Sequence, residues 1–280
     1  MKLIFILLLF LMSAVCFAEI KTVEYTDVVY KHTPQRDLML DIKYVENGVK
    51  KPVIFLIHGG GWTGGTKESM ENFGFPFFAE IYKKGYVVVS VQYRFIQESP
   101  FPACIEDCKS AVGFLRANAD RYEINPDIFI AGGHSAGGHL ASMLGVLSDD
   151  YYRDKNYSRF SSKVQGVIDM SGPVNFEMKG DPLGEAYSAN IKAWLCGNNP
   201  LLYKLSDPIN HIDRNAADFL IFQGAADEIV YYKQCDDFVK KLKDNNVYCD
   251  YVLTEGGGHV YDFGQYTDKV MAFLDRVSKK

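Results

Sequence analysis

One pentapeptide, Gly133–Gly137 with the sequence Gly-His-Ser-Ala-Gly, constrains the possible folds of this chain more than any other stretch. It follows an apolar run at 128–131, typical of a buried strand, and it precedes a run at 136–147 that is typical of a helix. A sharp turn between strand and helix requires glycine on both sides, because Cβ atoms would keep the two elements apart. The pattern therefore predicts that Ser135 is raised above a sheet edge, at the positive end of a helix dipole.

The rest of the chain divides into alternating strands and helices. Strands are predicted at 24–30, 38–45, 53–57, 86–91, 128–131, 164–170, 219–222 and 248–254. Helices are predicted at 71–84, 102–120, 136–147, 186–195, 231–244 and 264–277. The first two strands suit an antiparallel hairpin, and the later alternation predicts a mostly parallel sheet with helices on both faces. The irregular residues 171–212 are expected to form a small lid rather than a second domain.

The N-terminal residues 1–18 are predicted to be a cleaved secretory signal. Their apolar run, Leu3–Phe17, is shorter than the roughly 20 residues that a membrane-spanning helix needs, and Ala18 is a small residue suited to signal cleavage. A membrane anchor and a lipoprotein signal ending at Cys16 are the alternatives. The mature chain, 19–280, is then expected to be one α/β domain that is secreted or periplasmic and makes no contact with the membrane.

Charge and cysteine content exclude several classes of partner. The net charge is −5 and no basic run is present, which argues against nucleic acid as a partner. An odd number of cysteines follows the predicted signal, so at least one has no partner within the chain. A bridge between Cys235 and Cys249 remains open, and no zinc site is predicted. These cysteines are Cys104, Cys108, Cys196, Cys235 and Cys249.

Ser135 needs two further residues to act as a nucleophile. A serine hydroxyl is activated near neutral pH by a base that takes its proton, and that base is oriented by a third group. When the serine lies on a strand-to-helix turn, the acid and then the histidine follow it in the chain. We therefore predict that Asp227 orients His259 and that His259 activates Ser135. Glu228 and His211 are the alternative acid and base.

A glycine run after the third predicted strand has the sequence His-Gly-Gly-Gly-Trp and ends at Trp62. Attack of a serine on a carbonyl group creates an oxyanion, which needs preorganised N–H donors. Glycine lets the backbone approach a ligand closely. The predicted donors are the amides of Gly60, Gly61 and Ala136. Trp62 and His134 are predicted to contact the substrate.

These motifs resemble those of the α/β-hydrolase serine esterases, and in particular the acetyl-esterase and hormone-sensitive-lipase-like group. The resemblance extends from about Leu38 to the end of the chain and includes Tyr93-Arg94, Asp107 and the Ser-Asp-Pro sequence at 206–208. It implies a fold of about eight strands, hydrolysis of carboxylic esters, and no metal or other cofactor. We expect Arg94 to pair with Asp107 rather than with a substrate acid.

Within that group the chain looks most similar to secreted acetylxylan and feruloyl-type esterases. The resemblance implies a serine carboxylesterase that removes short acyl groups, acetyl or feruloyl, from a small molecule or a plant polysaccharide. Two other functions stay open. Arylformamidases and other amide hydrolases share the glycine loop and the triad, although the predicted signal disfavours a cytosolic arylformamidase. A hydrolase-like protein that only binds other molecules usually lacks the serine, the base or the glycines, and all are present here. The sequence does not indicate the oligomeric state.

Overall fold

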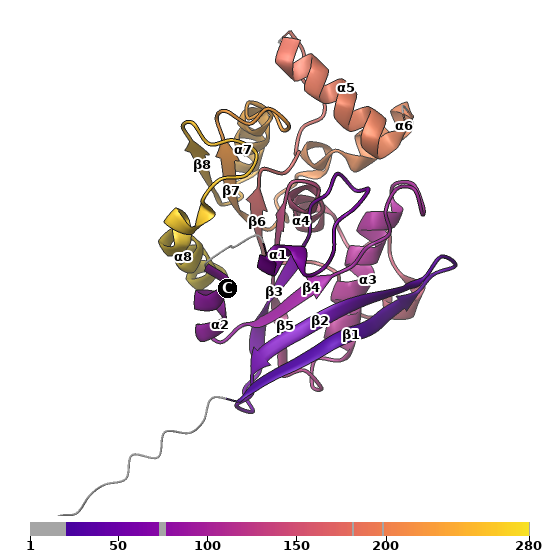
Figure 1. Cartoon of the computed structure of the whole chain (residues 1–280), viewed down its shortest axis with the longest axis vertical. Coiled ribbons are helices and arrows are strands. Elements are labelled where there is room, and N and C mark those ends of the chain that lie inside the picture. The colour runs from indigo at the N-terminus through magenta and orange to yellow at the C-terminus, as the bar shows by residue number, and fades with distance from the viewer. Residues whose placement is uncertain (1–20, 73–76, 181, 198, 280) are drawn as a thin grey trace, which may run out of the picture.

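The computed structural model describes residues 21–72, 77–180, 182–197 and 199–279, and the predicted signal at 1–18 lies outside them. The described chain forms an eight-stranded sheet with the order β1-β2-β4-β3-β5-β6-β7-β8 (Figure 1). The pairings of β1 with β2 and of β2 with β4 are antiparallel, and the others are parallel. The predicted α/β fold is confirmed. The strands are β1 (Thr22–His32), β2 (Asp37–Val45), β3 (Lys51–Ile57), β4 (Val87–Val91), β5 (Ile124–His134), β6 (Gly166–Met170), β7 (Asp218–Gly224) and β8 (Cys249–Thr254).

The helices follow the strands in the predicted alternation. The helix expected at 71–84 corresponds to α1 and α2, and its residues 73–76 lie outside the described chain. The α-helices are α1 (Ser69–Asn72), α2 (Phe77–Lys83), α3 (Ala103–Ala117), α4 (Ala136–Val146), α5 (Pro182–Cys196), α6 (Pro200–Ser206), α7 (Gln234–Asp244) and α8 (Thr267–Val277). Short 3₁₀ segments are η1 (Lys155–Tyr157), η2 (Pro208–His211) and η3 (Phe263–Tyr266). The prediction missed α6.

The sheet separates two hydrophobic cores. Successive side chains of a strand point to opposite faces, and in β3 the residues Val53, Phe55 and Ile57 belong to the core that α3, α4 and α7 cover. The intervening Ile54 and Leu56 belong to the core that α2 and α8 cover. All five side chains are buried. The continuous apolar run of this strand therefore reflects burial on both faces, as expected for a central parallel strand.

Residues 171–212 leave the sheet after β6 and return to it before β7, and they contain α5, α6 and η2. In Figure 1, α5 and α6 lie beyond one end of the sheet, away from the helices that cover its faces. One face of α5 is buried through Tyr187, Ile191 and Leu195. We propose that this segment is the predicted lid, because α5 borders the cavity described below.

Asp169, on β6, is a fully buried carboxyl that lies against Gly138 in the first turn of α4. Its Oδ2 accepts a hydrogen bond from Ser142 Oγ at 2.6 Å, and its Oδ1 accepts one from the Gly172 N–H at 2.8 Å. Burial raises the pKa of Asp169 from 3.8 to about 6, although both hydrogen bonds favour the carboxylate. Between about pH 4 and 6, the folded protein therefore holds a proton at Asp169 that the unfolded chain releases.

We expect Asp169→Asn to change how stability depends on pH. Since the pKa of Asp169 is higher in the folded state, the free energy of unfolding decreases as pH rises between about 4 and 6. The change across this window is about 3 kcal/mol at about 1.4 kcal/mol per pKa unit. Asparagine stays neutral and keeps an acceptor for Gly172, so the variant is expected to lose this decrease. Urea denaturation of both proteins at pH 4 and pH 7 measures the difference. Identical pH dependence in the two proteins would contradict this explanation.

Candidate active site

The turn between β5 and α4 has the sharp geometry that the glycines predict. Ser135 has a φ of 57° and a ψ of −122°, which lies in the region that side chains other than glycine rarely adopt. A Cβ on Gly133 would lie 2.3 Å from the carbonyl of Gly137, and a Cβ on Gly137 would lie 2.0 Å from the Ile57 oxygen. The Ser135 N–H donates to the Met170 carbonyl at 2.8 Å. The strained serine is thus held between two neighbouring strands.

Three predicted residues, distant in the sequence, lie in hydrogen-bond contact. His259 Nε2 lies 2.9 Å from Ser135 Oγ, and His259 Nδ1 lies 2.9 Å from Asp227 Oδ2. Ser135 lies on the β5–α4 turn, Asp227 in the loop after β7, and His259 in the loop after β8. These positions follow the carboxyl ends of three parallel strands, which meet at one edge of the sheet. The alternative acid, Glu228, is exposed. The alternative base, His211, donates from Nε2 to the Leu205 carbonyl at 3.0 Å.

Asp227 is a buried carboxylate with several donors. Burial favours its neutral form, but the hydrogen bond and charge of His259 and the N–H groups of Val230 and Ile229 hold the pKa of Asp227 below its usual range. These two N–H groups donate to Asp227 Oδ1 at 2.8 and 2.9 Å. A charged Asp227 favours the His259 tautomer with a proton on Nδ1, which leaves Nε2 to accept the proton of Ser135.

Gln223 supports the carboxylate from the side, and the sequence analysis did not identify it. Its Nε2 donates to Asp227 Oδ2 at 2.9 Å and to the Val230 carbonyl at 3.1 Å. The side chain is completely buried on β7. Its one signal in the sequence is an amide at the end of an apolar strand, four residues before Asp227.

Three predicted backbone donors lie beside Ser135. Gly60 and Gly61 have φ values of 111° and 59°, and the Gly60 carbonyl accepts the N–H groups of Thr63 and Gly64 at 3.1 and 3.2 Å. Ala136 is the first residue of α4. Within the described chain, no group accepts a hydrogen bond from the N–H of Gly60, Gly61 or Ala136. These amides therefore have no competing partner there for an oxyanion on a substrate.

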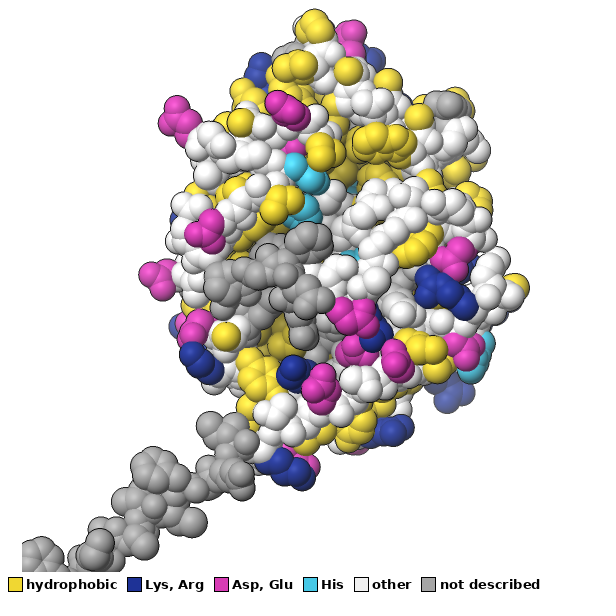
Figure 2. All heavy atoms as spheres, viewed as in Figure 1, with side chains coloured by type: hydrophobic (Ala, Val, Ile, Leu, Met, Phe, Trp, Pro, Cys, Tyr) yellow, Lys and Arg dark blue, Asp and Glu magenta, His cyan; other side chains and the backbone are white. Residues whose placement is uncertain are grey.

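Ser135 and His259 line a cavity of about 390 Å³. The glycine loop forms one wall of this cavity. Apolar side chains form another wall, and they include Trp194 of α5 and Ile229 of the loop that carries Asp227. Trp194 is 46% exposed and Ile229 is 50% exposed. Figure 2 shows hydrophobic side chains gathered over the region of α5, beside exposed histidine atoms. The candidate site is thus a small, largely apolar cavity with a few polar groups, as is usual for small-molecule sites.

Trp62 borders this cavity, but its polar edge faces the core. The indole is 1% exposed, and its N–H donates to His139 Nδ1 at 3.2 Å. His139 Nε2 in turn donates to the Ser206 carbonyl at 2.7 Å. Burial lowers the pKa of His139 to about 4, so the ring is neutral near pH 7 and can accept on one nitrogen while donating from the other. The indole N–H of Trp62 is therefore not free to bind a substrate.

His134 also borders the cavity, and it contacts the base. Its Nε2 donates to the backbone carbonyl of His259 at 2.9 Å, and the two ring centroids are 4.9 Å apart. Burial lowers the pKa of His134 to about 4, although the carbonyl partially opposes this effect. His134 directly precedes Ser135, so its neutral ring links the end of β5 to the glycine-rich loop that carries His259. The sequence prediction assigned His134 to substrate contact and missed this link.

We expect His134→Phe to lower kcat for p-nitrophenyl acetate about tenfold with little change in KM, because one hydrogen bond is worth about 0.5–1.5 kcal/mol. Phenylalanine keeps the ring but removes the donor that holds the His259 loop. His211→Phe is the matched control, since it removes a similar bond to a carbonyl that lies outside the cavity. Steady-state kinetics of the three proteins test this. Equal losses in both variants, or none in either, would contradict the role of His134.

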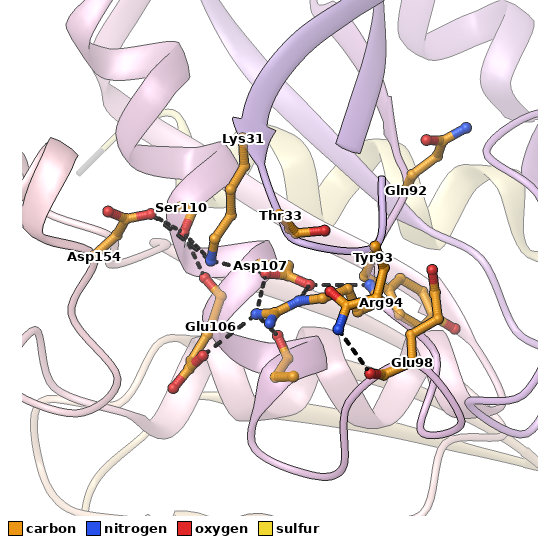
Figure 3. Close-up of polar contacts among 12 residues, drawn as sticks. Lys31, Thr33, Gln92, Tyr93, Arg94, Glu98, Glu106, Asp107, Ser110 and Asp154 are labelled. Carbon is orange, nitrogen blue, oxygen red and sulfur yellow. Dashed lines mark hydrogen bonds and ion pairs between the residues drawn. The ribbon is translucent and has the colours of Figure 1, made fainter. Parts of the chain in front are cut away.

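A buried network of ion pairs around Asp107 lies outside the cavity (Figure 3). Arg94 donates from Nε to Asp107 Oδ2 at 2.8 Å and from Nη2 to Asp107 Oδ1 at 2.7 Å. Lys31 Nζ lies 2.8 Å from Asp107 Oδ1, and Asp107 is fully buried. The expected pair of Arg94 and Asp107 is confirmed. The network joins β1 and the residues after β4 to α3.

Within the described residues, the cysteines form no disulfide and the potential metal ligands form no cluster. Cys104, Cys108, Cys196, Cys235 and Cys249 are free thiols, so the bridge left open between Cys235 and Cys249 is not formed. Among the residues that the structure describes, no group of three or more His, Cys, Asp or Glu side chains is arranged to hold a metal ion. None of the helices in this described part is long and apolar enough to cross a membrane.

Comparisons with known proteins define the class. The structure matches a truncated carbohydrate esterase from gut microbiota with a TM-score of 0.76 and 27% identity, over 92% of this chain and 97% of that chain. It matches a bifunctional GH43-CE protein of Bacteroides eggerthii with a TM-score of 0.78 and 26% identity, over 91% of this chain and 38% of that chain. The fold and these relatives define an α/β hydrolase similar to esterases.

The family follows from the sequence comparison. The BD-FAE family model matches residues 40–242, and the chain belongs to this family. Esterase LipC of Mycobacterium tuberculosis is 25% identical over 240 residues, which cover 81% of this chain and 59% of LipC. For the related LipM and LipQ of the same organism, the matched share is 49% and 47% of their length. The chain thus spans about half the length of these relatives.

Proposed function

We propose that this protein is a serine carboxylesterase that hydrolyses short acyl esters through an acyl-enzyme. The observation that carries the proposal is the hydrogen-bonded chain from Ser135 through His259 to Asp227, with both contacts of His259 at 2.9 Å. A nucleophile, a base and an orienting acid in this order are the groups that acyl transfer requires.

The first half of the proposed reaction forms the acyl-enzyme. Ser135 Oγ attacks the ester carbonyl carbon while His259 Nε2 takes the hydroxyl proton. The N–H groups of Gly60, Gly61 and Ala136 stabilise the oxyanion that develops on the carbonyl oxygen. His259, now an imidazolium beside a charged carboxylate, gives its proton to the leaving alcohol as the carbon–oxygen bond breaks.

The second half releases the acid. Water enters the cavity and attacks the acyl carbon of the ester on Ser135, and His259 takes the proton of that water. The same amides stabilise the second oxyanion. The bond to Ser135 Oγ then breaks, and His259 returns the proton to the serine. The acyl group leaves as a carboxylic acid, and the three residues regain their starting states.

We further propose that the substrate is an acetyl or feruloyl ester of a plant polysaccharide. A cavity of about 390 Å³ lies near the lower limit for small-molecule sites, which disfavours long alkyl chains on the acyl side. A matched structure is named a carbohydrate esterase, and a second match is to a bifunctional GH43-CE protein. The signal proposed at 1–18 would bring such an enzyme to a polysaccharide outside the cytoplasm.

A substrate panel tests the proposal. Purified protein is assayed with p-nitrophenyl esters of two, four and eight carbons, acetylated xylan, methyl ferulate and N-formylkynurenine. We expect turnover of the two-carbon ester and of acetylated xylan or methyl ferulate, and little turnover of the eight-carbon ester. Hydrolysis of N-formylkynurenine alone would replace the proposal with an arylformamidase. Folded protein that hydrolyses nothing in the panel would favour a binding protein.

A further inference from the structure

A second cavity, of about 570 Å³, lies beside the first. Four of its lining residues are on α5, at Leu183, Ala186, Tyr187 and Asn190, a spacing of three, four and seven residues that places them on one helix face. Trp194, one turn beyond Asn190, lines the first cavity. One side of α5 therefore borders both cavities. The helix is about 22 Å long, since its 15 residues each rise about 1.5 Å.

The loop that carries Asp227 forms the opposite wall. Ile229 lines both cavities, and Asp227 lines the second. The oxyanion glycines, Gly60 and Gly61, line the first cavity and not the second. The second cavity therefore adjoins the acid of the triad, and His259, which lines the first cavity, lies between that acid and Ser135. In the proposed reaction the leaving alcohol must lie on the His259 side of Ser135, because His259 protonates it.

The lining of the second cavity suits a neutral ligand with hydroxyl groups. It includes Asp227, whose carboxylate is buried, and the exposed Glu228, and the described lining residues include no Lys, Arg or His. An anionic ligand would be repelled there. Tyr231, Tyr232 and Asn190 add two phenols and an amide. Tyrosine combines an apolar ring face with a hydrogen-bonding hydroxyl, which matches the apolar faces and hydroxyl groups of a sugar.

We propose that the second cavity is a subsite for the carbohydrate that leaves in the esterase reaction, so that an acyl group on a neutral sugar chain is presented to Ser135. This inference rests on the proposed function and assigns the alcohol part of its substrate. The subsite lies between α5 and the loop at 225–232. The lid thus selects the sugar, whereas the glycine loop and Ser135 carry out the acyl transfer.

The test fills the second cavity and leaves the first unchanged. Ala186 is exposed and lines the second cavity, so Ala186→Trp is expected to block it. Ala189→Trp is the matched control, because Ala189 is also exposed on α5 but borders a separate surface hollow with Glu177 and Lys192. Both variants carry the same added ring on the same helix.

Kinetics with two substrates separate the possibilities. We expect Ala186→Trp to raise KM for an acetylated xylo-oligosaccharide at least tenfold and to keep kcat/KM for p-nitrophenyl acetate within about twofold. Ala189→Trp is expected to change neither. Equal losses on both substrates, or no loss with the oligosaccharide, would overturn the subsite. Wild-type enzyme that cleaves p-nitrophenyl acetate but not the oligosaccharide ester would also overturn it. Wild-type enzyme that cleaves neither would refute the proposed function instead.

A binding measurement tests the same subsite without turnover. Calorimetry with deacetylated xylo-oligosaccharide measures the affinity for the leaving alcohol. We expect binding to wild-type protein and to Ala189→Trp, and at least a tenfold weaker affinity for Ala186→Trp. Binding that is equal in all three proteins, or absent from wild-type protein, would place the sugar elsewhere.

Discussion

Ser135→Ala is expected to lower kcat for p-nitrophenyl acetate by roughly 10⁴–10⁶-fold, the range typical when a serine nucleophile is removed. Alanine has no oxygen to attack the ester, and the acyl-enzyme cannot form. The amides of Gly60, Gly61 and Ala136 remain, so a small residual rate above that of water is expected. Initial rates of purified wild-type and variant protein, with circular dichroism to verify folding, measure the loss.

A second serine serves as the control for this substitution. Ser278 follows α8 and lies outside both cavities, where its hydroxyl contacts Tyr86 at 2.7 Å. Ser278→Ala is expected to keep the wild-type rate. If folded Ser135→Ala protein keeps more than a tenth of the activity, the nucleophile is a different group.

Asp227→Asn is expected to lower kcat by roughly 10³–10⁴-fold, as expected when the histidine of a triad is held in the wrong tautomer. Asparagine would turn an N–H toward His259 Nδ1, so that Nδ1 becomes an acceptor and Nε2 carries the proton. The imidazolium would also lose the nearby negative charge. A pH–rate profile of kcat for both proteins measures the effect, and the loss is expected to persist above neutral pH because the carboxylate of Asp227 is charged there.

The control for Asp227→Asn is the same substitution at Asp236, an exposed carboxylate in the first turn of α7. Asp236→Asn removes one negative charge without touching His259. We expect it to keep nearly the wild-type kcat. Similar losses in both variants would show that the effect arises from net charge rather than from orientation of the base.

The sequence was sufficient to predict the parts of the site that depend on local backbone geometry. The turn at Ser135 follows from Gly133 and Gly137, since any side chain at either position would collide with a neighbouring backbone atom. The contact of His259 with Asp227 follows from their positions after parallel strands, whose carboxyl ends lie at one edge. Both predictions need only the order of the elements and the chemistry of a serine nucleophile.

Other features of the site depend on packing between distant segments and could not be read from the sequence. The bond from His134 to the His259 carbonyl forms because the loop after β8 folds over β5. Likewise, Trp62 lines the cavity as its place after the glycine loop suggests, but its N–H turns toward His139 in the core. Gln223 is another case, because an amide at the end of an apolar strand is too weak a signal to predict that it will bond to the carboxylate four residues later.

Helix α6 is different, because the sequence contained a signal that the prediction overlooked. Asn199 precedes Pro200, and its side-chain oxygen accepts the N–H of Leu201 at 3.0 Å. Asparagine before proline is a favourable start for a helix, since the first caps the free N–H groups and the second suits the first turn. Pro200 is the first residue of α6, within the segment 171–212 that the sequence analysis describes as irregular.

Labelling with a fluorophosphonate, followed by mass spectrometry of the peptides, tests most directly whether Ser135 is an activated nucleophile. The account predicts one adduct, on the peptide that contains Ser135, which disappears in Ser135→Ala and forms at least 100-fold more slowly in His259→Ala. Folded wild-type protein that forms no adduct, or forms it on another residue, would contradict the account.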